Sequence, residues 1–234
     1  GFVARVKAVD PQPMHFVSAT ATYPKEKEPV AAGGKGKELL AFTLQTEGVS
    51  DPLSLQSLEL STEASTAGVL NHLTLYAGTR AEPSAKIGEV EITGTTIQLQ
   101  LAEAKALSFG ENTFLLTGDV SPEAKTGDKI SLALKAVTLS GKKESLSLTP
   151  QETPYLVKNT HRSHEGQQEI PVYSDWIFTP TMTYGHYSPG NTDQVTIFSP
   201  GRRGEVIQLD FHSFEVLYEK SSLGTKATFE IYEG

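Results

Sequence analysis

Aromatic side chains that could bind a ligand are concentrated in one short stretch of the sequence. Between residues 173 and 187 the chain carries Tyr173, Trp176, Phe178, Tyr184, His186 and Tyr187. Aromatic faces contact the apolar C–H groups of sugar rings, and they also anchor protein interfaces. The predicted ligand-binding residues are therefore Tyr184, His186, Tyr187 and Trp176. The alternative is that Trp176 and Phe178 belong to a hydrophobic core, which leaves the other three as the more exposed candidates.

Oxygen-bearing side chains close to these aromatics could hold a calcium ion. Asn191 and Asp193 lie in the turn sequence PGNTD, and carboxylate and amide oxygens are common calcium ligands. Asn and Asp also favour turns for conformational reasons, and this interpretation is preferred. We therefore predict no cofactor, with calcium at Asn191 and Asp193 as the alternative. His161 and His164 beside Glu165 resemble part of a zinc site, but no third ligand lies near them in the sequence.

The residue patterns that usually mark catalysis are missing from the sequence. It contains no cysteine, no HExxH motif and no G-x-S-x-G motif, which removes the usual signatures of thiol, zinc-peptidase and serine-hydrolase chemistry. Arg202 and Arg203 could clamp a carboxylate, but two glycines flank the pair, as in an exposed turn. Glu89 and Glu91 lie on one strand face, where acidic residues ordinarily face solvent rather than act as a glycosidase pair. We predict that this chain is not an enzyme.

Composition restricts the partners that the chain can have. The 234 residues carry a formal charge of −8. Nucleic acids and anionic membranes require clustered Lys and Arg, so we predict no nucleic-acid partner. No apolar run approaches the ~18–20 residues of a membrane span, so we predict no membrane insertion. Without cysteine there are no disulfides, and the hydrophobic core alone must stabilise the fold. The sequence does not indicate an oligomeric state.

Alternation of apolar and polar residues predicts β-strands along most of the chain. The runs are 4–9, 15–22, 39–46, 53–61, 70–76, 87–92, 96–101, 113–117, 129–139 and 145–148, then 176–179, 194–198, 205–211, 214–218 and 227–232. Turns are predicted at Gly118-Asp119 and Gly127-Asp128, and a short helical turn at 102–107. The predicted fold class is all-β, with two antiparallel β-sandwich units of jelly-roll or CUB-like type.

A change of character near residue 150 divides the chain. Residues 149–168 are polar, contain prolines and show little periodicity, as expected of a linker. We predict a sandwich at 1–150, a linker or irregular lead-in at 151–168, and a second sandwich at 169–234. The second unit is small for a two-sheet core, so we expect it either to be cut short or to lean on the first. The strands predicted within residues 4–22 could join either unit.

Three sequence segments resemble the N-terminal β-sandwich module that precedes the catalytic propeller of some Bacteroidetes sialidases. They are LLAFTLQTEGVSDPLSLQSLELST, VLNHLTLYAGT and FGENTFLLTGDVSPEAKTGDKISLALKAV, within residues 35–139. The resemblance implies a β-sandwich accessory module. The repeated Ser-x-Asp-x-Gly-x-x-Trp boxes of the sialidase propeller do not occur in the sequence, so the resemblance implies no sialidase chemistry within this chain.

The end of the sequence resembles part of a cysteine-free bacterial CUB-like domain, over residues 170–234. The matching segments are YGHYSPGNTDQVTIFSPGRRGEVIQLDFHSFEV and FEIYEG. Calcium-binding members of that family carry an Asp just before the last matching strand. The corresponding place in this chain is near Lys226, whose ammonium group cannot ligate a cation. Glu233 also replaces the usual Asp. These departures count against calcium binding inherited from the family, and the family's last strands are not matched.

The sequence therefore predicts a non-catalytic accessory module of a secreted or cell-surface bacterial protein. Its predicted partner is a glycan or a cell-surface protein, or it positions a neighbouring catalytic domain. One alternative is a structural or adhesin-type module that contacts protein through an apolar patch or edge strand. A second alternative is the N-terminal piece of an exo-sialidase or peptidase whose active site lies outside this chain.

Overall fold

The computed structural model describes residues 11–25, 30–158, 160–162, 166–172, 177–179, 194–210 and 231. The chain divides into two compact units, Gly1–Asn159 and Thr160–Gly234. Their boundary falls inside the segment 151–168 that the sequence predicts to be a linker. Among the described residues, no helix has the length and hydropathy needed to cross a membrane.

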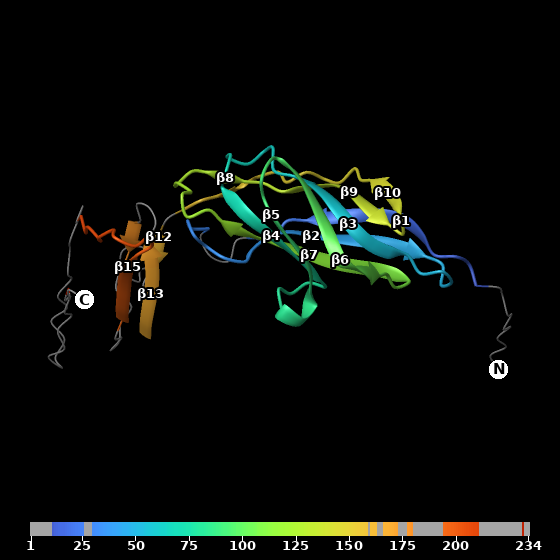
Figure 1. Cartoon of the computed structure of the whole chain (residues 1–234), viewed down its shortest axis with the longest axis horizontal. Coiled ribbons are helices and arrows are strands. Elements are labelled where there is room, and N and C mark those ends of the chain that lie inside the picture. Colours follow the sequence, from blue (N-terminus) through green and yellow to red (C-terminus); the bar gives the residue numbers. More distant parts are fainter. Residues whose placement is uncertain are drawn as a thin grey trace, which may run out of the picture. The chain divides into compact units, whose positions relative to one another are not determined.

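The first unit contains a five-stranded antiparallel sheet in the order β1-β2-β7-β4-β5 (Figure 1). Its strands are β1 (His15–Thr22), β2 (Lys37–Glu47), β7 (Gly110–Val120), β4 (Leu70–Ala77) and β5 (Lys86–Glu91). β7 lies at the centre, between β2 and β4. A short 3-10 helix, Pro83–Ala85, leads from β4 into β5.

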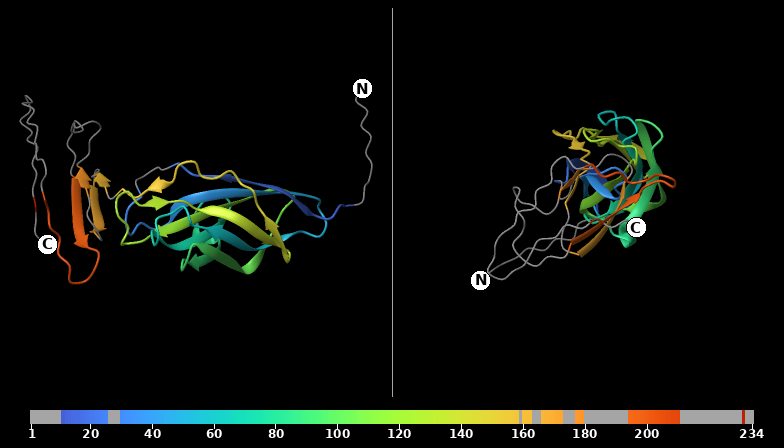
Figure 2. Two further views of the ribbon diagram at one scale, coloured as in Figure 1. Left: turned by 90° about the horizontal axis from the view of Figure 1, so that it is seen from above. Right: turned by 90° about the vertical axis from the view of Figure 1, so that its left-hand side faces the viewer.

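A four-stranded antiparallel sheet in the order β10-β9-β3-β6 forms the other layer of this unit (Figure 2). Its strands are β10 (Lys142–Ser145), β9 (Ala133–Leu139), β3 (Ser54–Ser61) and β6 (Thr96–Ala106). A separate pair joins β8 (Lys129–Ile130) to β11 (Tyr155–Leu156). The all-β fold class predicted from the alternating pattern is confirmed.

Alternate residues of both sheets bury a shared hydrophobic core. Phe42 of β2 stacks on Phe114 of β7, with ring centroids 5.1 Å apart and an interplanar angle of 23°. Leucines dominate the fully buried side chains around this pair, and they include Leu40, Leu44, Leu55, Leu58, Leu60, Leu73, Leu75 and Leu99. Because strand side chains alternate between faces, the apolar positions of the sequence pattern all reach this one layer.

Gly118-Asp119 is not a turn, contrary to the sequence prediction. Both residues lie inside β7, opposite Leu73 and His72 of β4. A side chain at Gly118 would contact buried leucines, so glycine serves close packing here rather than chain reversal. Gly127, by contrast, has φ +94° and lies in the predicted turn at Gly127-Asp128, where glycine accepts the left-handed backbone without strain.

Residues 102–107 do not form the predicted helical turn. β6 continues to Ala106, which pairs with Ser54, and Lys105 pairs with Leu55. Alanine, glutamate and lysine favour helices by intrinsic propensity, but pairing with β3 outweighs that preference because tertiary contacts routinely override propensity.

The predicted strand at 129–139 is interrupted, and the predicted strand at 145–148 is displaced. β8 ends at Ile130 and β9 begins at Ala133. Between them, the Ser131 amide donates to Ser65 Oγ at 2.8 Å, and Ser65 Oγ donates to the Ser131 carbonyl at 2.8 Å. A side chain therefore takes the place of a partner strand at this point. The last strand of the sheet, β10, lies at Lys142–Ser145 instead.

The described strands of the second unit pair in parallel. β12 (Thr160–Arg162) pairs with β14 (Ile177–Thr179), and β13 (Gly166–Val172) pairs with β15 (Gln194–Pro200). This differs from the antiparallel pairing predicted for this unit. The prediction was wrong because alternation of apolar and polar residues identifies a strand but does not specify its direction relative to a partner distant in the sequence. Residues 205–210 are not a strand as predicted. The predicted strands at 4–9 and 214–218, and all of 227–232 except Ile231, lie outside the described residues.

Candidate functional site

An open hollow of about 320 Å³ lies on the first unit, lined from the start of β5 and from β6. This volume is near the lower end of the ~300–1,000 Å³ found for small-molecule sites. Its apolar lining comes from Pro83, Ile87 and Ala102. Its polar lining comes from Lys86, Glu89 and Gln100, and Gly88 completes it.

The strands that form the hollow come close together because β5 carries a glycine at the contact. A Cβ atom at Gly88 would lie 2.8 Å from Leu99 Cδ2 of β6. Real carbon atoms do not approach that closely, so a side chain at this position would require the Leu99 side chain to move. Gly88 therefore lets Leu99 pack close against β5. On β6, Gln100 Nε2 donates a 3.0 Å hydrogen bond to the Gln56 carbonyl, which orients the Gln100 amide.

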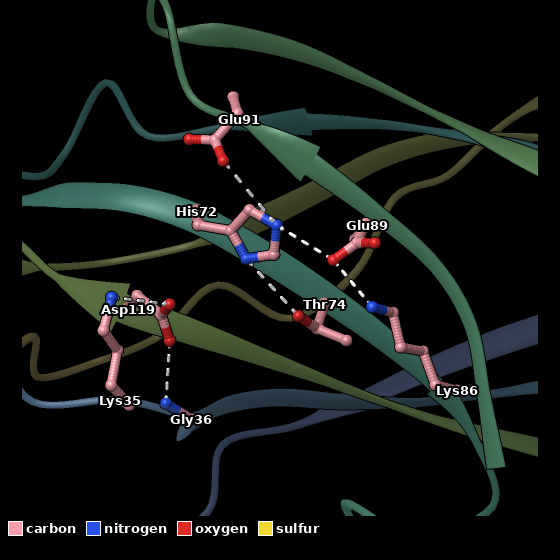
Figure 3. Close-up of polar contacts among 8 residues, drawn as sticks. All are labelled: Lys35, Gly36, His72, Thr74, Lys86, Glu89, Glu91 and Asp119. Carbon is pink, nitrogen blue, oxygen red and sulfur yellow. Dashed lines mark hydrogen bonds and ion pairs between the residues drawn. The ribbon is translucent and has the colours of Figure 1, made fainter. Parts of the chain in front are cut away.

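A polar cluster on β4 and β5, drawn in Figure 3, includes Lys86 and Glu89 from the lining of the hollow. Lys86 Nζ lies 2.7 Å from Glu89 Oε2, and His72 Nε2 lies 3.2 Å from the same oxygen. Glu91 Oε1 approaches His72 Nε2 at 4.0 Å. Thr74 Oγ1 lies 3.5 Å from His72 Nδ1. Strand register produces this group, because His72 is opposite Glu91 and Thr74 is opposite Glu89.

The carboxylate of Glu89 is the shared centre of this cluster. The hydrogen bond from Lys86 is the largest cause that holds the pKa of Glu89 below its ordinary value, and His72 adds to the effect. Lys86 and Glu89 remain half-exposed, with 41% and 50% of their side-chain surface accessible, whereas the His72 side chain is 19% accessible. The pair is therefore an ionised group that a ligand can reach from solvent.

Asp119 of β7 forms a second polar contact on this sheet (Figure 3). It accepts hydrogen bonds from Lys35 Nζ at 3.2 Å and from the Gly36 amide at 2.9 Å. In register it lies beside His72 on the neighbouring strand. Asp119 thereby ties the chain before β2 to the central strand, which is a structural task. Within the described ranges, no set of three His, Asp or Glu side chains is placed to hold a metal ion.

The residues that the sequence predicts as the ligand site lie outside the described residues. These are Tyr184, His186, Tyr187 and Trp176, together with the calcium candidates Asn191 and Asp193. The binding and calcium predictions for these positions stay predictions. Arg202 and Arg203 are described and lie in a turn, as the sequence predicts, where Arg202 Nη1 is 3.4 Å from Glu205 Oε1.

Sequence reasoning did not predict the hollow. Glu89 and Glu91 were predicted to share a solvent-facing strand face, and both do contact solvent, but both also approach His72. His72 and Lys86 were not singled out. The only local signal was the alternation in LNHLTLYA, which places the His72 and Thr74 side chains on the polar face. Their partners come from another strand, so no local pattern could name them.

Comparison with known proteins identifies no family for this chain. No protein-family model matches the sequence, and no curated protein matches it. Among solved structures, the chain is similar to the Hadza microbial sialidase Hz136, with a TM-score of 0.45, 15% identity, and coverage of 55% of this chain and 30% of that one. It is also similar to the CupB6 tip adhesin from Pseudomonas aeruginosa, with a TM-score of 0.24, 14% identity, and coverage of 69% and 60%.

Proposed function

We propose that this chain is a non-catalytic accessory module of a secreted or cell-surface bacterial protein, and that its first unit binds a glycan in the hollow at β5 and β6. The observation that supports this proposal is the mixed lining of the hollow. Pro83, Ile87 and Ala102 offer apolar contact to the C–H face of a sugar ring. Lys86, Glu89 and Gln100 offer donors and acceptors to its hydroxyl groups.

A binding role also suits how open this site is. Lys86 and Glu89 are half-exposed, and Pro83, Gln100 and Ala102 are exposed. Enzymes generally enclose the reacting atoms to exclude water and to strengthen electrostatic interactions. An open hollow of this kind instead supports reversible binding of an exposed sugar unit.

A glycan array probed with the full chain, with and without calcium, tests the proposal. Ala102→Trp should fill the hollow and abolish binding. Ala104→Trp is the matched control, because Ala104 is exposed on the same strand and does not line the hollow. Loss of binding in both variants, or in neither, would contradict a site in this hollow.

The same array distinguishes this hollow from the site predicted in the second unit. Tyr184→Ala and Tyr187→Ala should leave binding intact if the hollow is the site. Loss of binding in these two variants, with Ala102→Trp unaffected, would place the glycan in the second unit. A blank array for the unmodified chain at high concentration would rule out the glycan proposal.

A protein-binding role is the second candidate, and exposed apolar side chains at one end of the sandwich favour it. Val49 is 61% exposed and Phe109 is 63% exposed. They lie at the same end because Thr46, near the end of β2, pairs with Gly110 at the start of β7. Exposed apolar groups commonly mark protein contacts. A pull-down that loses its partner with Phe109→Ser, but keeps it with Ala102→Trp, would support this role.

A further inference from the structure

The positive charge in the hollow is already neutralised. Among the described residues, Lys86 is the only cationic side chain that lines the hollow. Its Nζ lies 2.7 Å from Glu89 Oε2. A carboxylate on a ligand would have to share Lys86 with Glu89, and the two carboxylates would repel each other at that short distance.

A further negative charge lies next to this pair. Glu91 approaches the same imidazole nitrogen of His72 that contacts Glu89, and its side chain is 78% exposed. Lys86, Glu89 and Glu91 together carry one positive and two negative formal charges, a sum of −1. The hydrogen bond from Lys86 favours the ionised form of Glu89, so this carboxylate keeps its negative charge.

We infer that the hollow binds neutral glycans and discriminates against glycans that end in a carboxylate sugar such as sialic acid. The inference rests on the proposed function and names the ligand class of the same site. Neutral sugar hydroxyls can donate to Glu89 and accept from Lys86 without breaking their ion pair. An acidic sugar meets a net negative charge and finds no free cation in the lining.

The size of this discrimination follows from Coulomb's law in a solvent-exposed site. One uncompensated charge at a separation of about 6 Å in water changes the affinity for a unit anion by roughly threefold. The neutral member of a glycan pair should therefore bind about threefold more tightly than its sialylated counterpart. Removing both carboxylates should shift that ratio by about tenfold in favour of the sialylated member.

The test is a mucin-type glycan array printed as matched neutral and sialylated pairs, probed at low salt because screening weakens exposed charges. The full chain is compared with Glu89→Gln and with the double variant Glu89→Gln/Glu91→Gln. The matched control is Glu59→Gln. Glu59 also pairs with a lysine, Lys143, at 2.6 Å, but it belongs to the four-stranded sheet and does not line the hollow.

We expect the unmodified chain to bind the neutral member of each pair more tightly. The single variant should reduce this preference, the double variant should reduce it further, and Glu59→Gln should leave it unchanged. Equal or tighter binding of the sialylated members by the unmodified chain would overturn this inference while leaving the glycan proposal intact. A ratio that Glu59→Gln alters as much as Glu89→Gln would also overturn it, because net charge of the whole chain would then explain the effect. No binding to either member of any pair would overturn the proposed function itself.

Discussion

Gly118 offers the most direct test of how the first unit packs. It lies within the central strand β7, and a Cβ atom there would be 2.6 Å from Leu39 Cδ1. The same atom would be 3.2 Å from Leu70 Cδ2 and 3.3 Å from Leu73 Cδ2. All three leucines are buried, with 1%, 4% and 0% of their surface exposed. Gly118→Ala therefore adds a methyl group where no space exists.

The expected change in the free energy of unfolding combines a loss from crowding with a smaller gain from backbone entropy. Carbon atoms prefer separations of about 3.5–4.0 Å, so the Leu39 methyl group must move by about 1 Å. Overpacking of this kind typically costs ~1–3 kcal/mol. Replacing glycine by alanine within a strand returns ~0.5–1 kcal/mol of backbone entropy. At the centre of these ranges the net destabilisation is about 1 kcal/mol, or a fall in Tm of about 2–4 °C for a chain of this size.

Urea unfolding followed by circular dichroism measures this change, and amide hydrogen exchange of β7 localises it to the first unit. Gly94→Ala is the matched control. Gly94 has open space around its Cβ position and does not adopt a left-handed φ. That variant should be neutral, or more stable by up to ~1 kcal/mol, because alanine restricts the unfolded chain.

A double-mutant cycle with Leu39→Val tests the cause of the effect. The shorter side chain should relieve part of the strain, so the double variant Gly118→Ala/Leu39→Val should be more stable than the sum of the single effects predicts. Gly118→Ala with unchanged stability would refute the packing argument. Strict additivity in the cycle would show that contact with Leu39 is not the source of the loss.

Three further predictions follow from individual contacts. Phe114→Ala removes a buried ring that stacks at 5.1 Å on its partner in β2; urea unfolding should show a loss of ~3–5 kcal/mol, and a loss below ~1 kcal/mol would contradict that packing. The hydrogen bond from Lys143 is the largest cause that lowers the pKa of Glu59 in the folded chain. The ionised Glu59 carboxylate therefore stabilises the fold at a pH above its ordinary pKa, and this stabilisation is lost as the pH falls through the lowered pKa. Glu59→Gln should reduce stability at pH 7 but not at pH 2, and an equal effect at both would refute this. Gly48→Ala forces a residue with φ +88° to carry a Cβ 2.2 Å from the Pro13 carbonyl oxygen; we expect a loss above ~1–2 kcal/mol and faster amide exchange in the segment around Pro13, and unchanged exchange there would count against it.

Strand formation in the first unit could be predicted because it depends on local alternation. The sequences of β2, β4 and β7 alternate apolar and polar residues over part of their length, and only a strand brings such residues to one face. The glycan-binding and calcium predictions, by contrast, depend on Tyr184, Tyr187 and Asn191, which lie outside the described residues. They remain predictions of the sequence alone.

Two predictions made from local composition, a turn at Gly118-Asp119 and a helical turn at 102–107, were wrong because tertiary contacts place both segments in strands. Gly118-Asp119 has the composition of a turn, yet it continues β7 because it pairs with β4, and the leucines that face Gly118 leave no space for a side chain. Residues 102–107 have helical propensity, yet Ala106 pairs with Ser54 in the sheet. Local composition carries no information about a neighbour that is distant in the sequence.

The sequence by itself therefore determined the all-β class and the approximate positions of most strands in the first unit. Only the tertiary structure decided the candidate site, because His72 and Glu89 belong to different strands and meet through the register of β4 and β5. A shift of that register by one residue would turn every side chain of β5 to the other face. The hollow likewise depends on the close approach of β5 to Leu99 of β6, which Gly88 permits. Register and close approach are properties of the packed sandwich as a whole, and they are not encoded at any single position of the chain.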